Sequence, residues 1–312
     1  MSAPARILVT PRSLTADDGV SRHPSLAPLR AHGFELVAGP PGRLPRPDEL
    51  PELLDGAVGW LAGVERISAD VLSSAGSLRV IARNGTGADS IDLEAATGLG
   101  IRVITAPGAN AQGVAELALA LALASVRDIV AADRTMKAGG WTRTSARELS
   151  ELRVGVAGYG AIGRRVATLF AAVGAEVRIY DPWALEPVAH RRVGSLEELA
   201  ETSDVLSLHA PPPADGSALV TAHLLERVPP GAILINTARS ALVDADAVAR
   251  ALDDGRLGAY AVDAFDTEPP VLDRLLRHER TIMTPHIGGF TAASVQRATD
   301  AAVAALVTAL AS

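Results

Sequence analysis

The sequence predicts an α/β protein of two domains, each built on a parallel β-sheet. The chain has 312 residues, which is enough for two domains of ordinary size. Short apolar runs alternate with helix-like segments along almost its whole length, a pattern typical of βαβ units. One apolar run in the second half ends in a glycine-rich turn that opens a helix. We therefore expect Rossmann-like or flavodoxin-like sheets in both domains.

The first domain is predicted to begin with a series of short strands separated by helices. The helix-like segments include residues 68–74, which Ser68 can cap, and residues 92–97. The proline-rich stretch 40–51 is expected to be a surface loop. The strand candidates are residues 7–10, 35–38, 57–62, 79–82 and 102–105. These elements together predict one domain over residues 1–105.

A second series of strands predicts the dinucleotide-binding domain over residues 106–289. It opens with a long Ala/Leu helix pattern from Asn110 to about Gly139. Ser195 and Glu198 form a plausible capping box before its third strand. The strand candidates are residues 153–157, 176–180, 205–208, 232–236, 259–263 and 281–284. The segment from Thr291 onward reads as one helix, and we expect residues 290–312 to complete the first domain, which would make that domain discontinuous.

Composition excludes several functional classes. The formal net charge is -7 and no basic run occurs, so neither nucleic acid nor a membrane surface is an expected partner. There is no cysteine, which removes disulfides, thiolate catalysis and cysteine-ligated zinc, and no metal site is predicted. The N-terminus lacks the apolar core of a signal peptide, and the most apolar stretch, residues 114–126, is too short to span a bilayer. We expect a cytoplasmic protein.

The clearest local motif is the glycine fingerprint formed by Gly158, Gly160 and Gly163, with Ala161 and Ile162 inside it. The first glycine permits a tight turn, the second lets backbone approach a pyrophosphate, and the third lets helix and strand pack closely. The N-terminus of the following helix offers N–H donors to phosphates. Taken alone, the same letters could be an ordinary glycine-rich turn.

An acidic residue strengthens the case for a dinucleotide. Asp181 directly follows the next predicted strand, at about the 20-residue separation expected for this motif. A carboxylate there accepts hydrogen bonds from the adenosine ribose and repels a 2′-phosphate, so NAD is favoured over NADP. Without the glycine motif, Asp181 could be a surface turn residue before Pro182.

Three later strands are each followed by a polar group that suits catalysis. These groups are Arg239, Glu268 and His286. The carboxyl ends of parallel strands are where ligands bind in open α/β sheets. An arginine, a glutamate and a histidine at that edge fit the oxidation of a 2-hydroxy acid.

The sequence resembles the D-isomer-specific 2-hydroxyacid dehydrogenases, and the phosphoglycerate dehydrogenase branch looks closest. The resemblance runs from Leu78 to Gly289 and is weaker toward both ends. It implies an active site in the cleft between two domains, and a short form without the regulatory domains of longer members. The segments that carry it are residues 93–97, 107–110, 114–116, 208–211 and 284–289, together with the glycine fingerprint.

The resemblance implies a role for each catalytic candidate. His286 would be the general base for alcohol oxidation and the acid for ketone reduction, which suits its pKa range. Glu268 would hold the imidazole, and its charge favours the protonated ring. Arg239 would bind the substrate carboxylate and polarise the C2 oxygen. The nicotinamide itself carries the hydride.

The resemblance also implies a substrate loop and further cofactor contacts. The loop is Asn84, Gly85, Thr86 and Gly87, whose backbone N–H groups could form a nest for the carboxylate, or simply a glycine turn. At the nicotinamide end we expect Thr237 and Asp263. The complete set of expected cofactor contacts is Gly158, Gly160, Ala161, Ile162, Gly163, Asp181, His209, Pro211, Thr237, Ala238, Asp263, His286, Gly288 and Gly289.

Two of these implications have structural alternatives. His209 and Pro211 would line the adenosine side, although His209 could equally be a strand-end residue without a ligand. The helix pattern after Asn110 resembles the family's dimerisation arm, which implies a homodimer. As bare sequence, it could simply be a core helix.

Departures from the family leave the identity of the acid open. Ala62 stands where phosphoglycerate dehydrogenases usually carry an arginine near the substrate phosphate, although Arg66 and Arg83 remain nearby. Thr86 disfavours a phosphite dehydrogenase, and Glu268 disfavours a formate dehydrogenase. Besides a small 2-hydroxy acid, one alternative substrate is a larger or phosphonate-like acid of a biosynthetic pathway. An alternative of another class is an NAD-sensing, corepressor-like binding protein.

Overall fold

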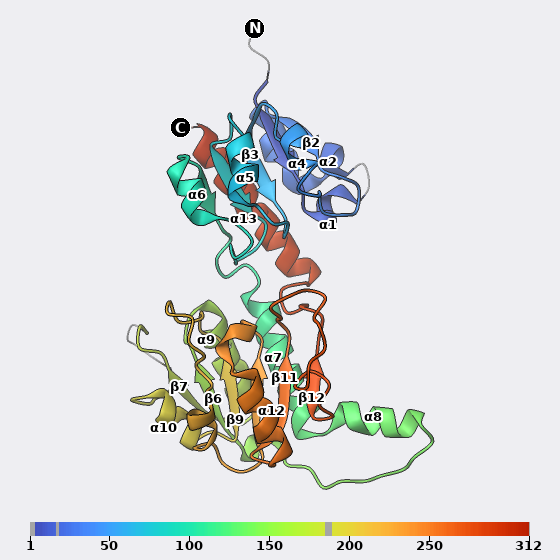
Figure 1. The fold of residues 1–312 in the computed structure, drawn as a ribbon, viewed down its shortest axis with the longest axis vertical. Coiled ribbons are helices and arrows are strands. Elements are labelled where there is room, and N and C mark those ends of the chain that lie inside the picture. The colour runs from blue at the N-terminus through green and yellow to red at the C-terminus, as the bar shows by residue number, and fades with distance from the viewer. Residues whose placement is uncertain (1–3, 17–18, 185–188, 312) are drawn as a thin grey trace. The chain divides into compact units, whose positions relative to one another are not determined.

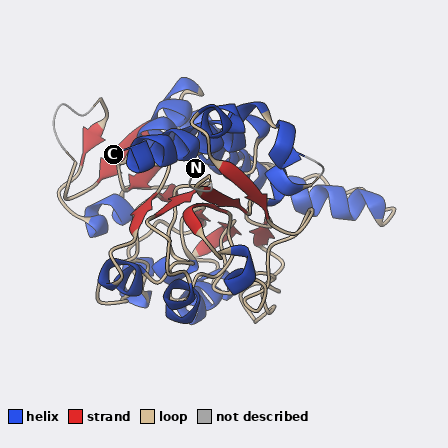
Figure 2. Ribbon diagram, turned by 90° about the horizontal axis from the view of Figure 1, so that it is seen from above, coloured by secondary structure: helices blue, strands red, loops and turns tan. Residues whose placement is uncertain are grey.

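The computed structural model describes residues 4–16, 19–184 and 189–311, and the chain divides into two compact units (Figure 1). One unit comprises Met1–Asn110 and Thr291–Ser312, and the other comprises Ala111–Phe290. Each unit holds one parallel sheet with helices on both faces (Figure 2), so the predicted fold class of two parallel-sheet α/β domains is confirmed. Among the described residues, no helix has the length and apolar character needed to cross a membrane.

The sheet of the first unit has five strands in the order β2-β1-β3-β4-β5, and every pair is parallel. This is the flavodoxin-like order, in which the strand order reverses between β1 and β3. Ligands of such sheets bind outside the carboxyl ends of the strands at this switch point. The strands are β1 (Arg6–Val9), β2 (Glu35–Ala38), β3 (Ala57–Ala62), β4 (Val80–Arg83) and β5 (Arg102–Ile104).

Two apolar layers cover the faces of this sheet, because alternate strand residues point to opposite sides. On one face Ile7 and Leu61 pack with Leu306 of the last helix, α13 (Ala292–Ala311). On the other face Leu8 and Trp60 pack against the short helices. The remaining helices of this unit are α1 (Arg12–Thr15), α2 (Gly19–Arg22), η1 (Pro24–Leu26), α3 (Ala27–Ala31), α4 (Leu50–Leu53), α5 (Ala69–Ser74) and α6 (Leu93–Gly98).

The second unit has seven parallel strands in the order β12-β11-β10-β9-β6-β7-β8. Its strand order reverses between β6 and β9, as in a dinucleotide-binding sheet. Six of the strands are those predicted, while the two-residue strand β8 was missed because two arginines carry no strand pattern. The strands are β6 (Arg153–Ala157), β7 (Glu176–Tyr180), β8 (Arg191–Arg192), β9 (Val205–Leu208), β10 (Ala232–Asn236), β11 (Leu257–Val262) and β12 (Thr281–Met283).

Helices on both faces enclose the second sheet in two apolar layers. Phe170 of α9 and Ala118 of α7 belong to one layer, and Leu199 of α10 and Val248 of α12 belong to the other. All four side chains are fully buried. The helices of this unit are α7 (Ala111–Val126), α8 (Ile129–Lys137), η2 (Leu149–Glu151), α9 (Ala161–Ala172), α10 (Leu196–Glu201), α11 (Ala222–Leu225), η3 (Ser240–Leu242) and α12 (Ala245–Asp253).

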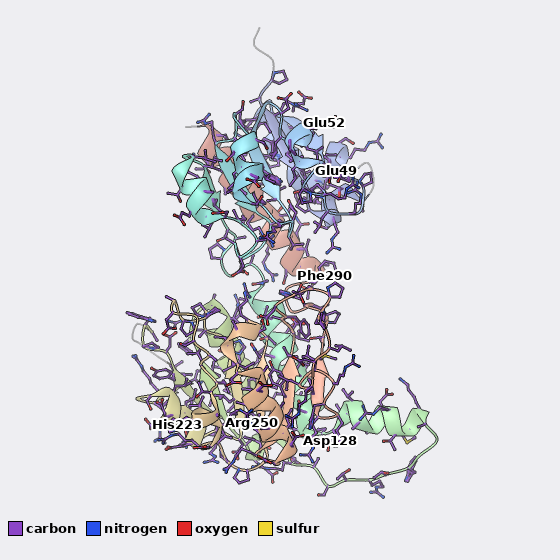
Figure 3. All side chains as sticks on the ribbon, viewed as in Figure 1. Glu49, Glu52, Asp128, His223, Arg250 and Phe290 are labelled. Carbon is purple, nitrogen blue, oxygen red and sulfur yellow. The ribbon has the colours of Figure 1, made fainter. Side chains whose placement is uncertain are left out.

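The long helix pattern from Asn110 to Gly139 forms two helices rather than one. The break lies at Asp128, whose φ of 49° is left-handed and interrupts the helical backbone (labelled in Figure 3). Helix α8 therefore leaves the direction of α7 and extends away from the rest of its unit (Figure 1). None of its residues is buried in the described part of the chain.

Two predicted helix caps differ in detail from the structure. Ser68 precedes α5, but its side chain makes no capping hydrogen bond. Ser195 does accept a bond from the Glu198 amide at 3.1 Å. The Glu198 carboxylate, however, accepts from the amide of Gly194 at 2.8 Å instead of closing the predicted capping box on Ser195. The position of a helix cap can be predicted from sequence, whereas the hydrogen bonds that the cap makes depend on the backbone conformation on either side of it.

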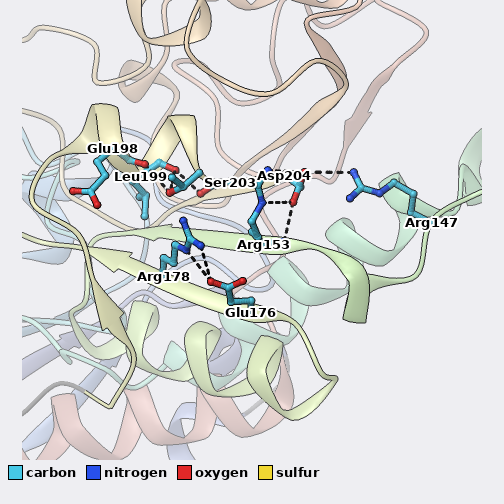
Figure 4. A network of polar contacts seen from close by, with 9 residues as sticks. Arg147, Arg153, Glu176, Arg178, Glu198, Leu199, Ser203 and Asp204 are labelled. Carbon is cyan, nitrogen blue, oxygen red and sulfur yellow. Dashed lines mark hydrogen bonds and ion pairs between the residues drawn. The ribbon is translucent and has the colours of Figure 1, made fainter.

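A carboxylate at the amino end of the second sheet joins three segments (Figure 4). Asp204 accepts from the backbone N–H and the Nε of Arg153, both at 2.9 Å, and pairs with Arg147 at 3.5 Å. Burial raises the pKa of Asp204, but its hydrogen bonds to Arg153 outweigh burial and hold that pKa below its ordinary value. The charged form is therefore the one that stabilises the fold.

Replacing Asp204 with asparagine is expected to lower the free energy of unfolding by about 1–2 kcal/mol near pH 7. Because the folded-state pKa is depressed, this contribution is present above the ordinary aspartate pKa and is lost as the pH falls through the folded-state value. Thermal unfolding midpoints measured from about pH 7 down to about pH 3 should therefore converge. Asp133→Asn, which removes an exposed pair with Lys137, is the control and should change little. A pH-independent difference for Asp204→Asn would contradict this account.

Candidate active site

The glycine fingerprint forms the turn between β6 and α9. Gly158 has a φ of +93°, and a Cβ there would lie 2.6 Å from the backbone of His209. A Cβ on Gly163 would lie 1.9 Å from the carbonyl oxygen of Gly158. At Gly160, which precedes the first helical residue Ala161, a Cβ would meet no atom of the described residues within 4 Å. Two glycines are thus required by the protein's own backbone, whereas Gly160 leaves open space that fits an approaching pyrophosphate.

Asp181 is held against this turn. Its carboxylate accepts from the amide of Tyr159 at 2.7 Å and from the amide of Trp183 at 2.8 Å, one bond on each oxygen. A carboxylate oxygen has a second lone pair, so both oxygens can still accept from ribose hydroxyls. The Tyr159 ring lies beneath the guanidinium of Arg164, 4.6 Å from ring centroid to Cζ. The predicted partner of the glycine turn therefore lies beside it.

His209 follows β9 next to the same turn. Its Nε2 contacts the hydroxyl of Ser207 at 2.7 Å, while its Nδ1 is buried without a partner among the described residues. Burial lowers the pKa of His209 to about 3, so the ring is neutral near pH 7. An orphaned buried ring nitrogen here fits a polar group of a bound ligand. Pro211, predicted beside it, is exposed.

The turn after β10 presents Arg239. Its geometry is set by Asn236, a fully buried residue that the sequence reasoning missed as a site residue. The Asn236 amide nitrogen donates to the carbonyl of Arg239 at 2.8 Å, and its oxygen accepts from the amide of Ala238 at 3.1 Å. An asparagine ending an otherwise apolar strand was the available signal. The hydroxyl of Thr237 in the same turn is buried without a partner in the described chain.

Asp263, directly after β11, fixes the loop that carries His286. One of its oxygens accepts from the Thr284 hydroxyl at 2.6 Å and the Ile287 amide at 2.9 Å, and the other from the Gly288 amide at 2.8 Å. The residue is only 2% exposed. A Cβ at Gly288 would lie 2.9 Å from Asp263, so glycine is needed there. Asp263 therefore positions residues 284–288 on both sides of the histidine.

His286 and Glu268 meet within this frame. The Nδ1 of His286 lies 2.5 Å from Oε1 of Glu268, and both side chains are about half exposed. His286 has a left-handed φ of 52°, which is unusual for a residue with a side chain and is maintained by the bonds to Asp263 around it. The bond to Glu268 uses Nδ1 and leaves Nε2 as the ring nitrogen that can reach a substrate.

All these groups lie at the carboxyl ends of the parallel strands of the second sheet. Gly158, Asp181 and His209 form one cluster around the glycine turn. The Arg239 turn follows β10, Asp263 and Glu268 follow β11, and His286 follows β12. These three strands are neighbours in the sheet. No group of three or more acidic or histidine side chains that could hold a metal ion occurs within residues 4–16, 19–184 and 189–311.

The predicted substrate loop belongs to the first unit and follows β4. The amide of Gly85 donates to the carbonyl of Arg83 at 2.8 Å, so this member of the predicted nest is already engaged. Thr86 and Gly87 supply the other amides of the loop. The side-chain oxygen of Asn84 lies 3.3 Å from the hydroxyl of Thr299 on the last helix.

Comparison with known proteins agrees with this geometry. Residues 119–288 match the family model of the D-isomer specific 2-hydroxyacid dehydrogenase, NAD binding domain. The D-3-phosphoglycerate dehydrogenase of Mycobacterium tuberculosis is 39% identical over 243 residues, 76% of this chain and 46% of that protein, so the chain spans about half its length. The hydroxypyruvate reductase of Thermotoga maritima is 34% identical over 74% of this chain and 78% of its own. Protein TT0316 of Thermus thermophilus superposes with a TM-score of 0.85, at 35% identity, over 98% of this chain and 97% of its own.

Proposed function

The chain belongs to the D-isomer specific 2-hydroxyacid dehydrogenase family, with its NAD-binding domain, and on this basis we propose that it is an NAD-dependent oxidoreductase. Its substrates would be small D-2-hydroxy acids and the corresponding 2-keto acids. The observation that carries the proposal is the His286–Glu268 hydrogen bond, held by Asp263 at the sheet edge that also ends in the Arg239 turn. A histidine oriented by a carboxylate is the arrangement expected of a general acid and base.

Each residue has a distinct task in this proposal. Bound NAD supplies the hydride acceptor for C2, or the donor in the reverse direction. His286 takes the hydroxyl proton of the substrate on Nε2 as the alcohol becomes a ketone, and returns it during reduction. Glu268 accepts from Nδ1 and holds the ring in the orientation that leaves Nε2 for the substrate. Arg239 binds the substrate carboxylate, since a guanidinium stays charged and can form two parallel bonds to it.

The glycine turn would hold the cofactor. Gly160 leaves room for the pyrophosphate, and the first turn of α9 offers it backbone N–H donors. Asp181 would accept from the adenosine ribose hydroxyls and disfavour a 2′-phosphate. His209, whose Nδ1 has no partner among the described residues, would contact the adenosine side, and the Thr237 hydroxyl and Asp263 would contact the nicotinamide end.

The proposal is tested by NADH consumption with the purified protein and a panel of 2-keto acids. The panel is glyoxylate, hydroxypyruvate, pyruvate, 2-oxoglutarate and 3-phosphohydroxypyruvate. We expect turnover with at least one small 2-keto acid, with NADH preferred to NADPH because of Asp181. Tight NADH binding without turnover of any acid would contradict the enzymatic proposal and favour a binding role.

We also propose that the protein is a homodimer joined through α8. This nine-residue helix has no buried residue in the described chain, yet it exposes apolar side chains. Ile129 is 52% exposed and Met136 is 52% exposed, and the nearby Trp141 is 77% exposed. A short isolated helix is marginal in water, so its apolar side needs a covering surface, and a second copy of this arm supplies one.

Changing Ile129 and Met136 together to aspartate is expected to convert a two-chain species into single chains, because the charges would be buried at the interface. Molar mass from light scattering at micromolar concentration measures the change. Lys137→Gln, on the same helix, is the control and should retain the two-chain mass. A single-chain mass for the unaltered protein would exclude the dimer.

A further inference from the structure

Two buried charges in the first unit take no part in the catalytic arrangement described above. Glu65 is 3% exposed and Arg83 is 9% exposed. Isolated charges are rarely buried, because removal from water is costly unless an opposite charge compensates them. These two residues follow β3 and end β4, and the two strands pair with Ala62 opposite Arg83. Both charges therefore lie at the carboxyl edge of the five-stranded sheet.

Glu65 is held rigidly at this edge. One carboxylate oxygen accepts from the hydroxyl of Thr10 and from the amide of Gly63 at 2.9 Å. Thr10 itself accepts from the indole N–H of Trp60 at 2.9 Å. The second carboxylate oxygen is buried and has no hydrogen-bond partner among the described residues. The negative charge of Glu65 is thus only partly compensated by its hydrogen bonds.

Arg83 lies directly beneath the predicted substrate loop. Its Nη1 donates to the carbonyl of Asn84 at 3.0 Å, and a Cβ at Gly85 would lie 3.1 Å from the same nitrogen. Its Nε is buried without a partner in the described chain. Burial lowers the pKa of Arg83, and the charges of Glu65 and of the exposed Asp89 act against that decrease. The positive charge of Arg83 is therefore balanced inside the protein, in part by Glu65.

Glu65 and Arg83 lie where a ligand of this sheet would be expected to bind. The edge lies at the β1/β3 switch point, where open α/β sheets bind ligands. Thr10 follows β1, Glu65 follows β3, and the loop from Asn84 to Gly87 follows β4. A substrate whose carboxylate binds this loop would therefore feel the combined charge of Glu65 and Arg83.

We propose that Glu65 is a specificity-determining residue that offsets the charge of Arg83, so that the enzyme prefers 2-keto acids with uncharged side chains over phosphorylated ones. The inference rests on the proposed dehydrogenase function. A phosphate dianion needs uncompensated positive charge to offset its desolvation, and the negative charge of Glu65 acts against the positive charge of Arg83. Ala62, the last residue of β3, carries no charge. Arg66 is exposed to water, where solvent and salt screen its charge.

The test compares kcat/KM for 3-phosphohydroxypyruvate with that for hydroxypyruvate in three variants. Glu65→Gln keeps the shape and removes the charge, and it should raise the ratio about tenfold, mainly through a lower KM for the phosphorylated acid. Arg83→Gln should lower the ratio by a similar factor. Thr10→Val loses a hydroxyl of the same cluster without any change in charge, so its ratio should stay within about twofold.

The possible results distinguish an effect of charge on substrate preference from a packing defect in the variants. Opposite shifts in Glu65→Gln and Arg83→Gln support the inference, because a packing defect would move both in one direction. An unchanged ratio in Glu65→Gln, or an equal shift in Thr10→Val, would overturn it. Thermal midpoints of all three variants are measured first, and the ratios are then compared at a temperature at which every variant is folded.

Failure of the proposed function would be recognised separately. If the unaltered protein reduces none of the five 2-keto acids of the panel, the dehydrogenase proposal fails; if it reduces only acids other than these two, that proposal stands. The charge effect is then read from calorimetric dissociation constants of 3-phosphoglycerate and D-glycerate on the NADH-loaded protein. The same opposite shifts in their ratio are expected, and a ratio equal in all variants, or no binding of either acid, would refute the role of Glu65.

Discussion

Replacing His286 with alanine should lower kcat for reduction of a 2-keto acid by about 10³-fold, within the range measured for the loss of a general acid or base. The reason is that, in the proposed mechanism, His286 exchanges a proton with the substrate oxygen through Nε2, since its Nδ1 is already bound to Glu268. NADH affinity should change much less, because the glycine turn and Asp181 remain intact. Steady-state kinetics together with NADH fluorescence titration separate the two quantities.

Two further variants sharpen this result. Glu268→Gln keeps a hydrogen-bond acceptor for the ring but removes the charge, so its loss in kcat should be smaller, about 10-fold to 100-fold. His223→Ala removes an exposed histidine on α11 of the same unit and should retain full activity. If His286→Ala kept more than about a tenth of the rate, the histidine could not be the proton donor.

Replacing Gly163 with alanine should disrupt the second unit itself. The added Cβ would lie 1.9 Å from the carbonyl oxygen of Gly158, a backbone atom that cannot move without distorting the turn. Strain of this kind in a packed core costs about 1–3 kcal/mol or more, and the variant should show a lower thermal midpoint and no measurable NADH binding. Calorimetry and NADH titration on the full chain measure both effects.

Gly160→Ala is the matched comparison for this prediction. A Cβ there meets no atom within 4 Å in the part of the chain that the structure describes, so the thermal midpoint without cofactor should stay close to that of the unaltered chain. NADH binding should nevertheless weaken by about tenfold or more, because the methyl group enters space kept for the pyrophosphate. Equal behaviour of the two variants would contradict the assignment of that space to the cofactor.

The pattern of apolar runs was sufficient to predict most strands of both sheets. Buried parallel strands are apolar on both faces and therefore stand out from the helices between them. The strand β8 was missed because Arg191 and Arg192 lie at a sheet edge, where only backbone pairing defines a strand. The break at Asp128 was missed because a single left-handed residue leaves the surrounding helical pattern intact.

The candidate site was likewise predicted from the sequence only in part. The sequence indicated the cofactor turn by its glycines and its acidic residue, and the catalytic candidates by polar residues at strand ends. Each of these positions requires a particular residue type, because only that type has the necessary backbone freedom or functional group. Asn236 and Glu65 were not singled out, since their roles arise from partners in backbone turns and on neighbouring strands. Their partners are the Arg239 carbonyl and the Thr10 hydroxyl.

The sequence by itself determined the alternation of strands and helices, the glycine turn and the residue types at the strand ends, because these depend on local periodicity and local backbone demands. Only the tertiary structure decided that Asp263 ties down the His286 loop and that Arg83 shares a buried edge with Glu65. The contact between Glu268 and His286 was expected from the family resemblance, and the structure gives its geometry. Those contacts join residues from different strands, and their geometry follows from sheet order and register. Long-range pairing of this kind leaves no local pattern in a single sequence.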